Sequence, residues 1–354
     1  MNMNSRDRIL AAINHQRPDR LPTDIWATPE SWAKLRKHFG EGTDILAALH
    51  IDGFAGGWPK YVGPALPAVG PNEQIDYWQI RRKTMTYDQG EYCELACCPL
   101  AKAQTIDDIE AYPWPQADWF DCTGMAQTFR QAREKQAVQV GYQAPFFYHN
   151  LLRGLELSLM DPLVEPEFTQ HLMERITESF LAIHRRIFEA CEGLIDVTQV
   201  TDDLGMQTGP MISLATFRTF YKPCMKRMIE LAREFGIKVM HHDDGAMRMF
   251  LPDLIEIGID ILNPIQWRCP GMECAGLKRD FGKQLCFHGG IDNQQTLPFG
   301  TPEAVRKEVR EVIDALASDH TGYIFAPCHN IQVVSPVENV IAMYDEAWKY
   351  GKLA

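Results

Sequence analysis

The segment Lys238-Val239-Met240-His241-His242-Asp243-Asp244-Gly245 joins a short apolar run to a cluster of imidazoles and carboxylates. The residues at 237–240 favour a buried β-strand, and a helical pattern of apolar residues follows the glycine. The polar cluster therefore lies where a strand ends and a helix begins. In proteins built from β/α units, ligands bind at that carboxyl end of the strands. His242 and Asp244 are two residues apart, so an extended backbone directs both side chains to one side.

Two interpretations of this cluster compete. In the first, Asp243 or Asp244 caps the following helix by accepting hydrogen bonds from its backbone N–H groups. In the second, His242 and Asp244 form half of a metal site or an acid–base pair. Because two histidines and two aspartates occur together, we favour the functional interpretation.

The chain beyond residue 137 alternates between short apolar strands and amphipathic helices. The expected strands lie at 137–142, 195–200, 237–240, 259–264, 284–288 and 323–326. This alternation is typical of parallel βαβ units. A strand at 20–26 and a weaker one near 53–57 bring the count close to eight. We therefore predict an α/β fold, a (β/α)8 TIM barrel with an N-terminal extension, and keep an open doubly wound sheet as the alternative.

A β-hairpin is expected between residues 77 and 96, appended to the main sheet. Its strands are rich in aromatic and β-branched residues, and Asp88-Gln89-Gly90 marks the turn.

Composition excludes several classes of function. The formal net charge is −12, which argues against a broad nucleic-acid surface. No apolar run approaches the length of a membrane span, and the N-terminus lacks the apolar core of a signal peptide. The ten cysteines mostly occur singly, in a chain too long to need disulfides. We therefore expect a reduced, cytoplasmic protein that binds a small molecule and neither nucleic acid nor membrane. The oligomeric state stays open, with a homodimer as one alternative.

Five strand ends in the second half carry polar residues that would share one rim of a barrel. They are Asp202, Asp203 and Gln207; His242 and Asp244; Asn263 and Gln266; His288 and Asp292; and Cys328, His329 and Asn330. Histidine, aspartate and cysteine are zinc-type ligands, and a catalytic zinc keeps three protein ligands and one open position.

We assign four of these residues to a metal site: His242, Asp244, His288 and Cys328. A thiolate ligand would argue against an alkaline-earth ion. The structural alternatives are a small buried thiol for Cys328 and a core histidine, bonded to a backbone carbonyl, for His288.

The remaining candidates are assigned to catalysis or to substrate binding. Asp202, Asp203 and His329 would orient the substrate or move protons, although one of the two aspartates is expected to bond to loop backbone. The substrate-binding candidates are Gln207, Tyr148, Trp26 and Asn330. For Tyr148 and Trp26 the alternative is a core aromatic.

Several of these segments also carry a family resemblance. They are the opening run Arg6–His15 with Pro18–Pro22, the middle run Thr201–Gln207, His242–Gly245, Gly289–Asp292, Leu297–Pro302 and Ala326–Asn330. With these motifs the chain resembles the uroporphyrinogen decarboxylase-like superfamily, and within it the corrinoid-dependent methyltransferase branch. The resemblance covers nearly the whole chain. It implies one barrel domain over 1–354, with the extension, hairpin and first strands in 1–120 and the main β/α repeats in 121–354.

The resemblance also implies chemistry. The methyltransferase branch holds zinc, which activates a thiol or the heteroatom of a methyl donor, and it exchanges the methyl group with a corrinoid on a separate protein. Its zinc pattern is His-x-Cys with a distant Cys. Here His242 and Cys328 match the first and last positions, and Asp244 stands in place of the middle cysteine. The Asp-x-His-x-x-Gly loop of corrinoid-binding domains is absent, so the corrinoid would come on a partner.

Three functions remain in competition at this stage. The first is a zinc-dependent methyltransferase acting between a small O- or N-methylated compound, or a thiol, and a corrinoid protein. The second is a metal-dependent lyase, decarboxylase or hydrolase that needs no corrinoid. The third is a non-catalytic binding subunit. Porphyrinogen decarboxylation is disfavoured, because the chain lacks the Arg-Gln-Ala-Gly-Arg run that meets that substrate's carboxylates.

Overall fold

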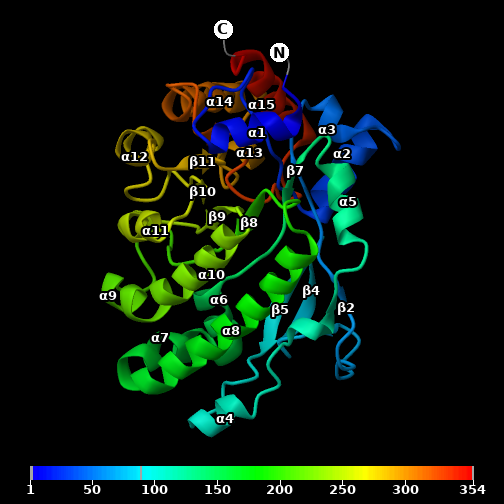
Figure 1. The fold of residues 1–354 in the computed structure, drawn as a ribbon. Helices are drawn as coiled ribbons and strands as arrows, with labels where there is room; N and C mark the ends of the chain where they lie inside the picture. Colours follow the sequence, from blue (N-terminus) through cyan, green and yellow to red (C-terminus); the bar gives the residue numbers. More distant parts are fainter. Residues whose placement is uncertain (1–2, 88–89, 353–354) are drawn as a thin grey trace.

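Parallel strands form the centre of the molecule (Figure 1). The computed structural model describes residues 3–87 and 90–352. Its main sheet has seven strands in the order β1 (Phe54–Gly56), β7 (Ala137–Gln139), β8 (Val197–Gln199), β9 (Lys238–His242), β10 (Ile261–Asn263), β11 (Cys286–His288) and β12 (Tyr323–Ile324). Every pair of neighbours in this sheet is parallel.

Residues 22–24 close the sheet into a barrel. The Phe325 amide donates to the carbonyl of Pro22 at 2.9 Å, and the Asp24 amide donates to the carbonyl of Phe325 at 2.8 Å. On the other side, the Asp52 and Gly53 amides donate to the carbonyl of Thr23, each at 3.0 Å. This segment therefore lies between β12 and the start of β1 and occupies the eighth strand position of the barrel. The predicted (β/α)8 barrel is confirmed.

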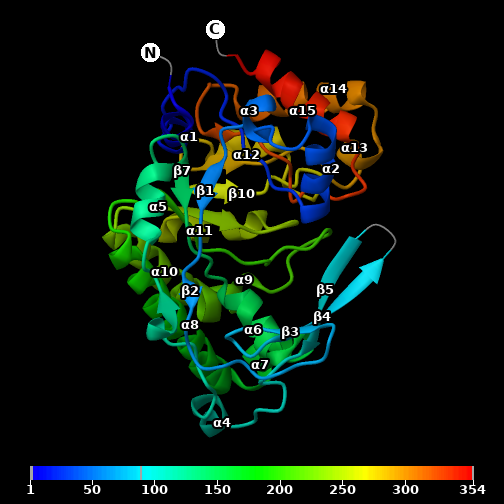
Figure 2. The same ribbon diagram turned by 90° about the vertical axis from the view of Figure 1, so that its right-hand side faces the viewer.

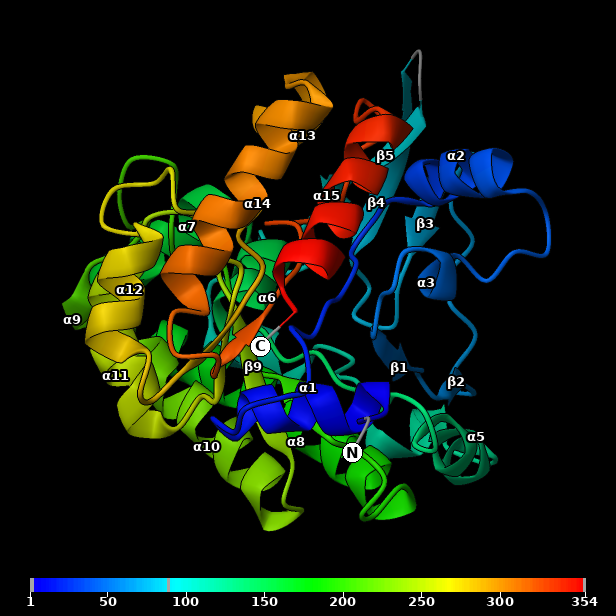
Figure 3. The ribbon, with the colours of Figure 1, turned by 90° about the horizontal axis from the view of Figure 1, so that it is seen from above.

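Helices cover the outside of the barrel. Their bounds are α1 (Ser5–Ile13), α2 (Pro29–Phe39), α3 (Ile45–Ala48), α4 (Ile106–Glu110), α5 (Met125–Ala132), α6 (Pro145–Arg153), α7 (Leu155–Val164), α8 (Pro166–Ala190), α9 (Leu214–Thr216), α10 (Lys222–Glu234), α11 (Leu251–Ile257), α12 (Cys274–Phe281), α13 (Thr296–Phe299), α14 (Pro302–Leu316) and α15 (Val337–Tyr350). Short helical turns are η1 (Ala117–Trp119), η2 (Phe217–Tyr221) and η3 (Arg248–Phe250). Figure 3 shows α12, α14 and α15 side by side in chain order.

Helix α14 illustrates why these segments are helical and where they pack. Thr301 caps it by accepting a hydrogen bond from the Ala304 amide, and Pro302 occupies the first turn, where its missing N–H costs nothing. Its apolar residues recur at helical spacing and are buried: Val305, Val309, Val312, Ile313 and Leu316. They form the stripe that faces the barrel.

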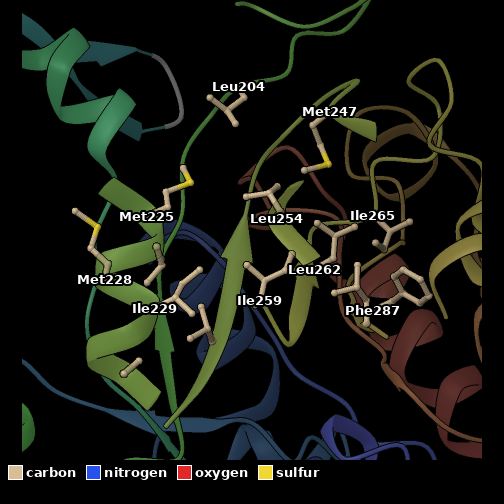
Figure 4. Close-up of a cluster of buried hydrophobic side chains, with 14 of the residues drawn as sticks. Leu204, Met225, Met228, Ile229, Met247, Leu254, Ile259, Leu262, Ile265 and Phe287 are labelled. Carbon is tan, nitrogen blue, oxygen red and sulfur yellow. The ribbon is translucent and has the colours of Figure 1, made fainter. Parts of the chain in front are cut away.

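An apolar layer fills the space between the strands and the outer helices (Figure 4). Leu262 and Phe287 point outward from β10 and β11, and Met225 and Ile229 come from α10. All four side chains are fully buried. Burial of one such side chain contributes about 2 kcal/mol, so this layer is the main source of stability on that side.

The amino end of the barrel is closed by α1. Ile9, Ala12 and Ile13 pack against the interior residues that open the strands, namely Ala137, Val197, Met240, Ile261, Cys286 and Ile324. Because apolar residues occupy this end, the polar interior positions are those at the carboxyl ends of the strands.

A long insertion after β1 carries the remaining strands. β2 (Lys60–Tyr61) pairs with β6 (Phe120–Asp121), and β3 (Glu73–Ile75), β4 (Arg81–Tyr87) and β5 (Gly90–Cys97) form a separate antiparallel sheet. The predicted hairpin is therefore present as β4–β5, but its expected attachment to the main sheet was wrong, because its free edge pairs with β3. Figure 2 shows this sheet standing beside the barrel. Asp88 and Gln89, in the predicted turn, lie outside the described residues.

Within the described residues, no helix is both long and apolar enough to cross a bilayer.

Candidate metal centre

Three side chains converge at the carboxyl end of the barrel: His242, Asp244 and His329. Each offers one ligand atom, and the three atoms lie within 4.8 Å of one another. The Asp244 Oδ2 atom is 3.9 Å from His242 Nε2 and 3.7 Å from His329 Nε2. Donors on one tetrahedral zinc ion are about 3.4 Å apart, so a small contraction would place all three on one ion.

Asp203 provides a fourth donor. Its Oδ1 atom lies 3.9 Å from His242 Nε2, and this atom is buried without a hydrogen-bond partner in the described chain. Burial raises the pKa of the Asp203 carboxyl, and it lowers the pKa of the His329 imidazole. An orphaned carboxylate oxygen beside two imidazoles fits a cation, because a cation would supply its missing partner. The donor set therefore fits a zinc-type ion.

Backbone packing holds Asp203 and Asp244 at this rim. Gly245 has a φ of +84°, and a Cβ at this position would lie 2.6 Å from the carbonyl oxygen of Met206. The loops after β8 and β9 thus touch backbone to backbone, and the Ala246 amide donates to the Met206 carbonyl at 2.8 Å. Only glycine permits this approach, which explains the glycine that ends the Asp-Asp run.

A chain of hydrogen bonds fixes the orientation of His242. Its Nδ1 lies 2.6 Å from Asn263 Oδ1, the Asn263 Nδ2 lies 2.7 Å from His288 Nδ1, and His288 Nε2 lies 2.9 Å from Asp24 Oδ2. An amide oxygen only accepts and an amide nitrogen only donates. His242 must therefore carry its proton on Nδ1, and His288 must carry its proton on Nε2. This leaves the His242 Nε2 lone pair free for a metal, as in many metal sites.

Trp26 forms one wall of the centre. Its indole stacks on the His242 ring at a centroid distance of 5.5 Å, and its N–H donates to Asp24 Oδ2 at 3.1 Å. These contacts place Trp26 at the carboxyl end of the barrel, and its role in substrate binding stays a prediction.

Two predicted metal ligands lie outside the group of three. His288 is fully buried, and both of its ring nitrogens are occupied by Asn263 and Asp24, so it has no lone pair free for an ion. The Cys328 thiol donates to the carbonyl of Ile265 at 3.6 Å, and burial raises its pKa well above the usual value. Among the described residues, its sulfur is not one of the donor atoms that converge within 4.8 Å. His329, predicted to be catalytic, is instead the third member of the candidate group.

Two of the other predicted site residues lie at the centre, and the rest make contacts elsewhere in the protein. Gln207 lines a cavity beside the centre, and Asp203 faces His242. Asp202 instead accepts hydrogen bonds from the Phe146 and Phe147 amides at 3.0 and 2.7 Å, so both of its oxygens are bonded to backbone. Tyr148 packs between Trp78 and Phe180, which makes it a core aromatic.

The backbone carbonyl of Asn330 accepts hydrogen bonds from Asn293 and Gln332.

Sequence reasoning missed Asp24 as part of the centre and gave Asn263 no role. Asp24 and Trp26 are two residues apart on an expected strand, the same spacing that drew attention to His242 and Asp244. The two-residue alternation of side chains along a β-strand, applied to the expected strand at 20–26, places Asp24 on the same side as Trp26.

The profile of the family described as Uroporphyrinogen decarboxylase (URO-D) matches residues 98–350. The chain belongs to this family. URO-D relatives include the uroporphyrinogen decarboxylase of Syntrophotalea carbinolica, 27% identical over 183 residues, which are 51% of this chain and 48% of the relative. A uroporphyrinogen decarboxylase of Thermus thermophilus is 28% identical over 182 residues, 50% and 47% of the two chains. The chain spans about half the length of the curated relatives it matches.

A solved structure extends the likeness to nearly the whole chain. A methyltransferase from Methanosarcina mazei superposes with a TM-score of 0.69 at 17% identity, covering 98% of this chain and 99% of that one. At this identity the likeness establishes the fold.

Proposed function

We propose that this protein is a metal-dependent methyltransferase that moves a methyl group between a small O- or N-methylated compound and a corrinoid on a separate protein. The observation that carries the proposal is the convergence of His242, Asp244 and His329 at the barrel mouth, with the orphaned oxygen of Asp203 beside them. The Methanosarcina mazei methyltransferase supports the proposal because it has the same fold over almost its entire length.

The cavity next to these ligands disfavours a porphyrinogen. Its lining includes no lysine or arginine among the described residues. A tetrapyrrole with several carboxylates needs positive side chains. The names of the curated relatives therefore do not transfer directly to this chain's substrate.

In this proposal, His242, Asp244 and His329 hold zinc, with Asp203 as a further donor. Bound there, zinc supplies Lewis-acid stabilisation to the heteroatom that loses its methyl group. A cobalt(I) corrinoid on the partner protein would supply the electron pair for a new bond to the methyl carbon. The heteroatom would then leave with the pair of the broken bond and take up a proton from solvent. Trp26 excludes water from one side, and the hydrogen bond from His242 Nδ1 to Asn263 keeps the imidazole in place.

Metal content of purified protein, measured by plasma mass spectrometry, tests the centre. We expect zinc close to one equivalent, lost in His242→Ala and His329→Ala and retained in Cys328→Ala, because the Cys328 thiol bonds to a backbone carbonyl. Absence of zinc from protein purified without chelators would contradict the metal mechanism. Loss of zinc from Cys328→Ala alone would contradict our ligand assignment.

Methyl transfer is then tested with free cob(I)alamin and a series of methoxylated and N-methylated compounds. Consumption of cob(I)alamin that depends on both zinc and His242 supports the proposal. Turnover without a corrinoid would instead favour the metal-dependent lyase or hydrolase.

A further inference from the structure

Five carboxamides surround the cavity beside the candidate metal centre. The cavity is lined by Asp244, Cys328 and His329 on one side, and by the side chains of Gln207, Gln266, Asn293, Gln294 and Gln332. These amides come from the loops that follow β8, β10, β11 and β12. Four separate loops therefore contribute the same functional group to one small space.

Only part of this hydrogen-bonding capacity is used within the protein. Gln266 accepts from the Gly245 amide at 2.7 Å and donates to Gln207 Oε1 at 3.3 Å. Asn293 and Gln332 each donate to the Asn330 carbonyl at 3.3 Å. In the described part of the chain, Gln207 Nε2, Asn293 Oδ1, Gln332 Oε1 and both amide atoms of Gln294 have no protein partner. Gln207, Gln294 and Gln332 are exposed, so these groups are open to solvent or to a ligand. The unused set contains both donors and acceptors.

Charge selects against an anion in this cavity. No lysine or arginine of the described chain lines it, and Arg268 on the loop after β10 is bound to Asp292 at 2.7 Å and lies 3.7 Å from Glu308. A divalent ion held by Asp203 and Asp244 would leave no net charge at the centre. The amides then decide which ligand is preferred.

The mixture of free hydrogen-bond donors and acceptors on these amides also disfavours a cationic ligand. A carboxylate only accepts hydrogen bonds and an ammonium group only donates them, whereas a hydroxyl does both. A mixed set of free amide donors and acceptors therefore matches hydroxyl groups best. A space of about 250 Å³ corresponds to roughly eight water molecules, enough for one small ring.

We propose that this cavity binds an uncharged methyl ether that carries several hydroxyl groups, such as a methoxylated polyol or monosaccharide. The inference rests on the proposed methyltransferase function and names its substrate class. The ether oxygen would face the ion held at Asp244 and His329, which line the cavity, and the hydroxyls would pair with Gln294, Gln332 and Asn293.

Binding to the zinc-loaded protein tests the proposal directly. The probes are methyl α-D-glucopyranoside, a mono-O-methylated inositol, methyl α-D-glucopyranosiduronate as the anionic counterpart, and methylammonium as a cation that accepts no hydrogen bond. Calorimetry should give at least one of the two neutral probes an affinity about tenfold above those of the uronide and methylammonium. Tighter or equal binding of either charged probe, or no binding of both neutral ones, would overturn the proposal.

Two variants assign the binding to the amides. Gln294→Ala and Gln332→Ala should each weaken binding of the neutral probe about three- to tenfold, as expected for a lost hydrogen bond. Gln295→Ala is the matched control, since Gln295 is adjacent to Gln294 and equally exposed but does not line the cavity. Gln294→Lys should raise the affinity for the uronide. Unchanged affinities in both alanine variants would place the ligand elsewhere and overturn the proposal.

The same samples separate this inference from the proposed function. Zinc content and methyl transfer from simple methoxylated compounds are measured alongside binding. Zinc and transfer without binding of either neutral polyol would overturn the substrate class alone. Binding of the polyols to a protein without zinc or methyl transfer would overturn the proposed function and leave the binding site standing.

Discussion

Asn263 is the residue on which the orientation of the centre depends. One side of its amide accepts from His242, and the other donates to His288, so a single side chain sets the proton positions of two imidazoles. Outer hydrogen bonds of this kind orient a metal ligand and raise its basicity.

Asn263→Ala should therefore lower zinc affinity by about 10- to 100-fold, while the three direct ligands stay unchanged. Competition titration with a zinc chelator measures the effect. Asn330→Ala is the control, because Asn330 lies at the same rim and its side chain takes no part in this chain of hydrogen bonds. Equal zinc affinities in the two variants would contradict the role of Asn263.

The first turn of helix α6 is held by Asp202, a residue that the sequence pattern had assigned to the site. Asp202 is 1% exposed, and its two oxygens accept from the amides of Phe146 and Phe147 in the first turn of α6. Those amides have no partner within the helix, so a side chain from another strand satisfies them. The sequence motif Thr201-Asp202-Asp203 thus contains one structural and one site-facing carboxylate.

Asp202→Ala should destabilise the protein by about 1–3 kcal/mol, because two buried N–H groups lose their acceptor. Urea unfolding measures the change. Asp203→Ala provides the comparison, since the Asp203 side chain is 42% exposed and its backbone hydrogen bond comes from the Asp244 amide alone, so its effect should be smaller than that of Asp202→Ala. A larger loss in Asp203→Ala than in Asp202→Ala would contradict this division of roles.

Across the whole molecule, three buried histidines are held neutral. Burial lowers the pKa of His149 to about 3 and lowers the pKa values of His184 and His241 to about 4. Each folded-state pKa lies below the value of an unfolded histidine, so the folded protein binds fewer protons than the unfolded chain at intermediate acidity. This contribution to stability is fully present above pH 6.5 and is lost as the pH falls towards 4.

His149→Gln should reduce this loss. Between about pH 6 and pH 4.5, the free energy of unfolding should fall less steeply in the variant, by about 1.4 kcal/mol per pH unit. Urea titrations at several pH values measure both slopes, with His38→Gln, an exposed position, as the control. Parallel pH dependences of His149→Gln and the parent protein would contradict a neutral buried His149.

Local sequence patterns determined much of this protein. The alternation of short strands and amphipathic helices predicted the barrel, since each strand and each helix reveals its period within a few residues. The period of two also placed His242 and Asp244 on one side of β9.

Other features depended on contacts between distant segments. The choice of His329 over His288 and Cys328 as the third partner depends on which ring nitrogens and which thiol are already hydrogen-bonded, and those partners lie 25 to 264 residues away in the chain. The division between Asp202 and Asp203 likewise depends on the position of α6. Local patterns therefore determined the barrel and its polar rim, and only the tertiary structure decided which rim residues have lone pairs left for an ion.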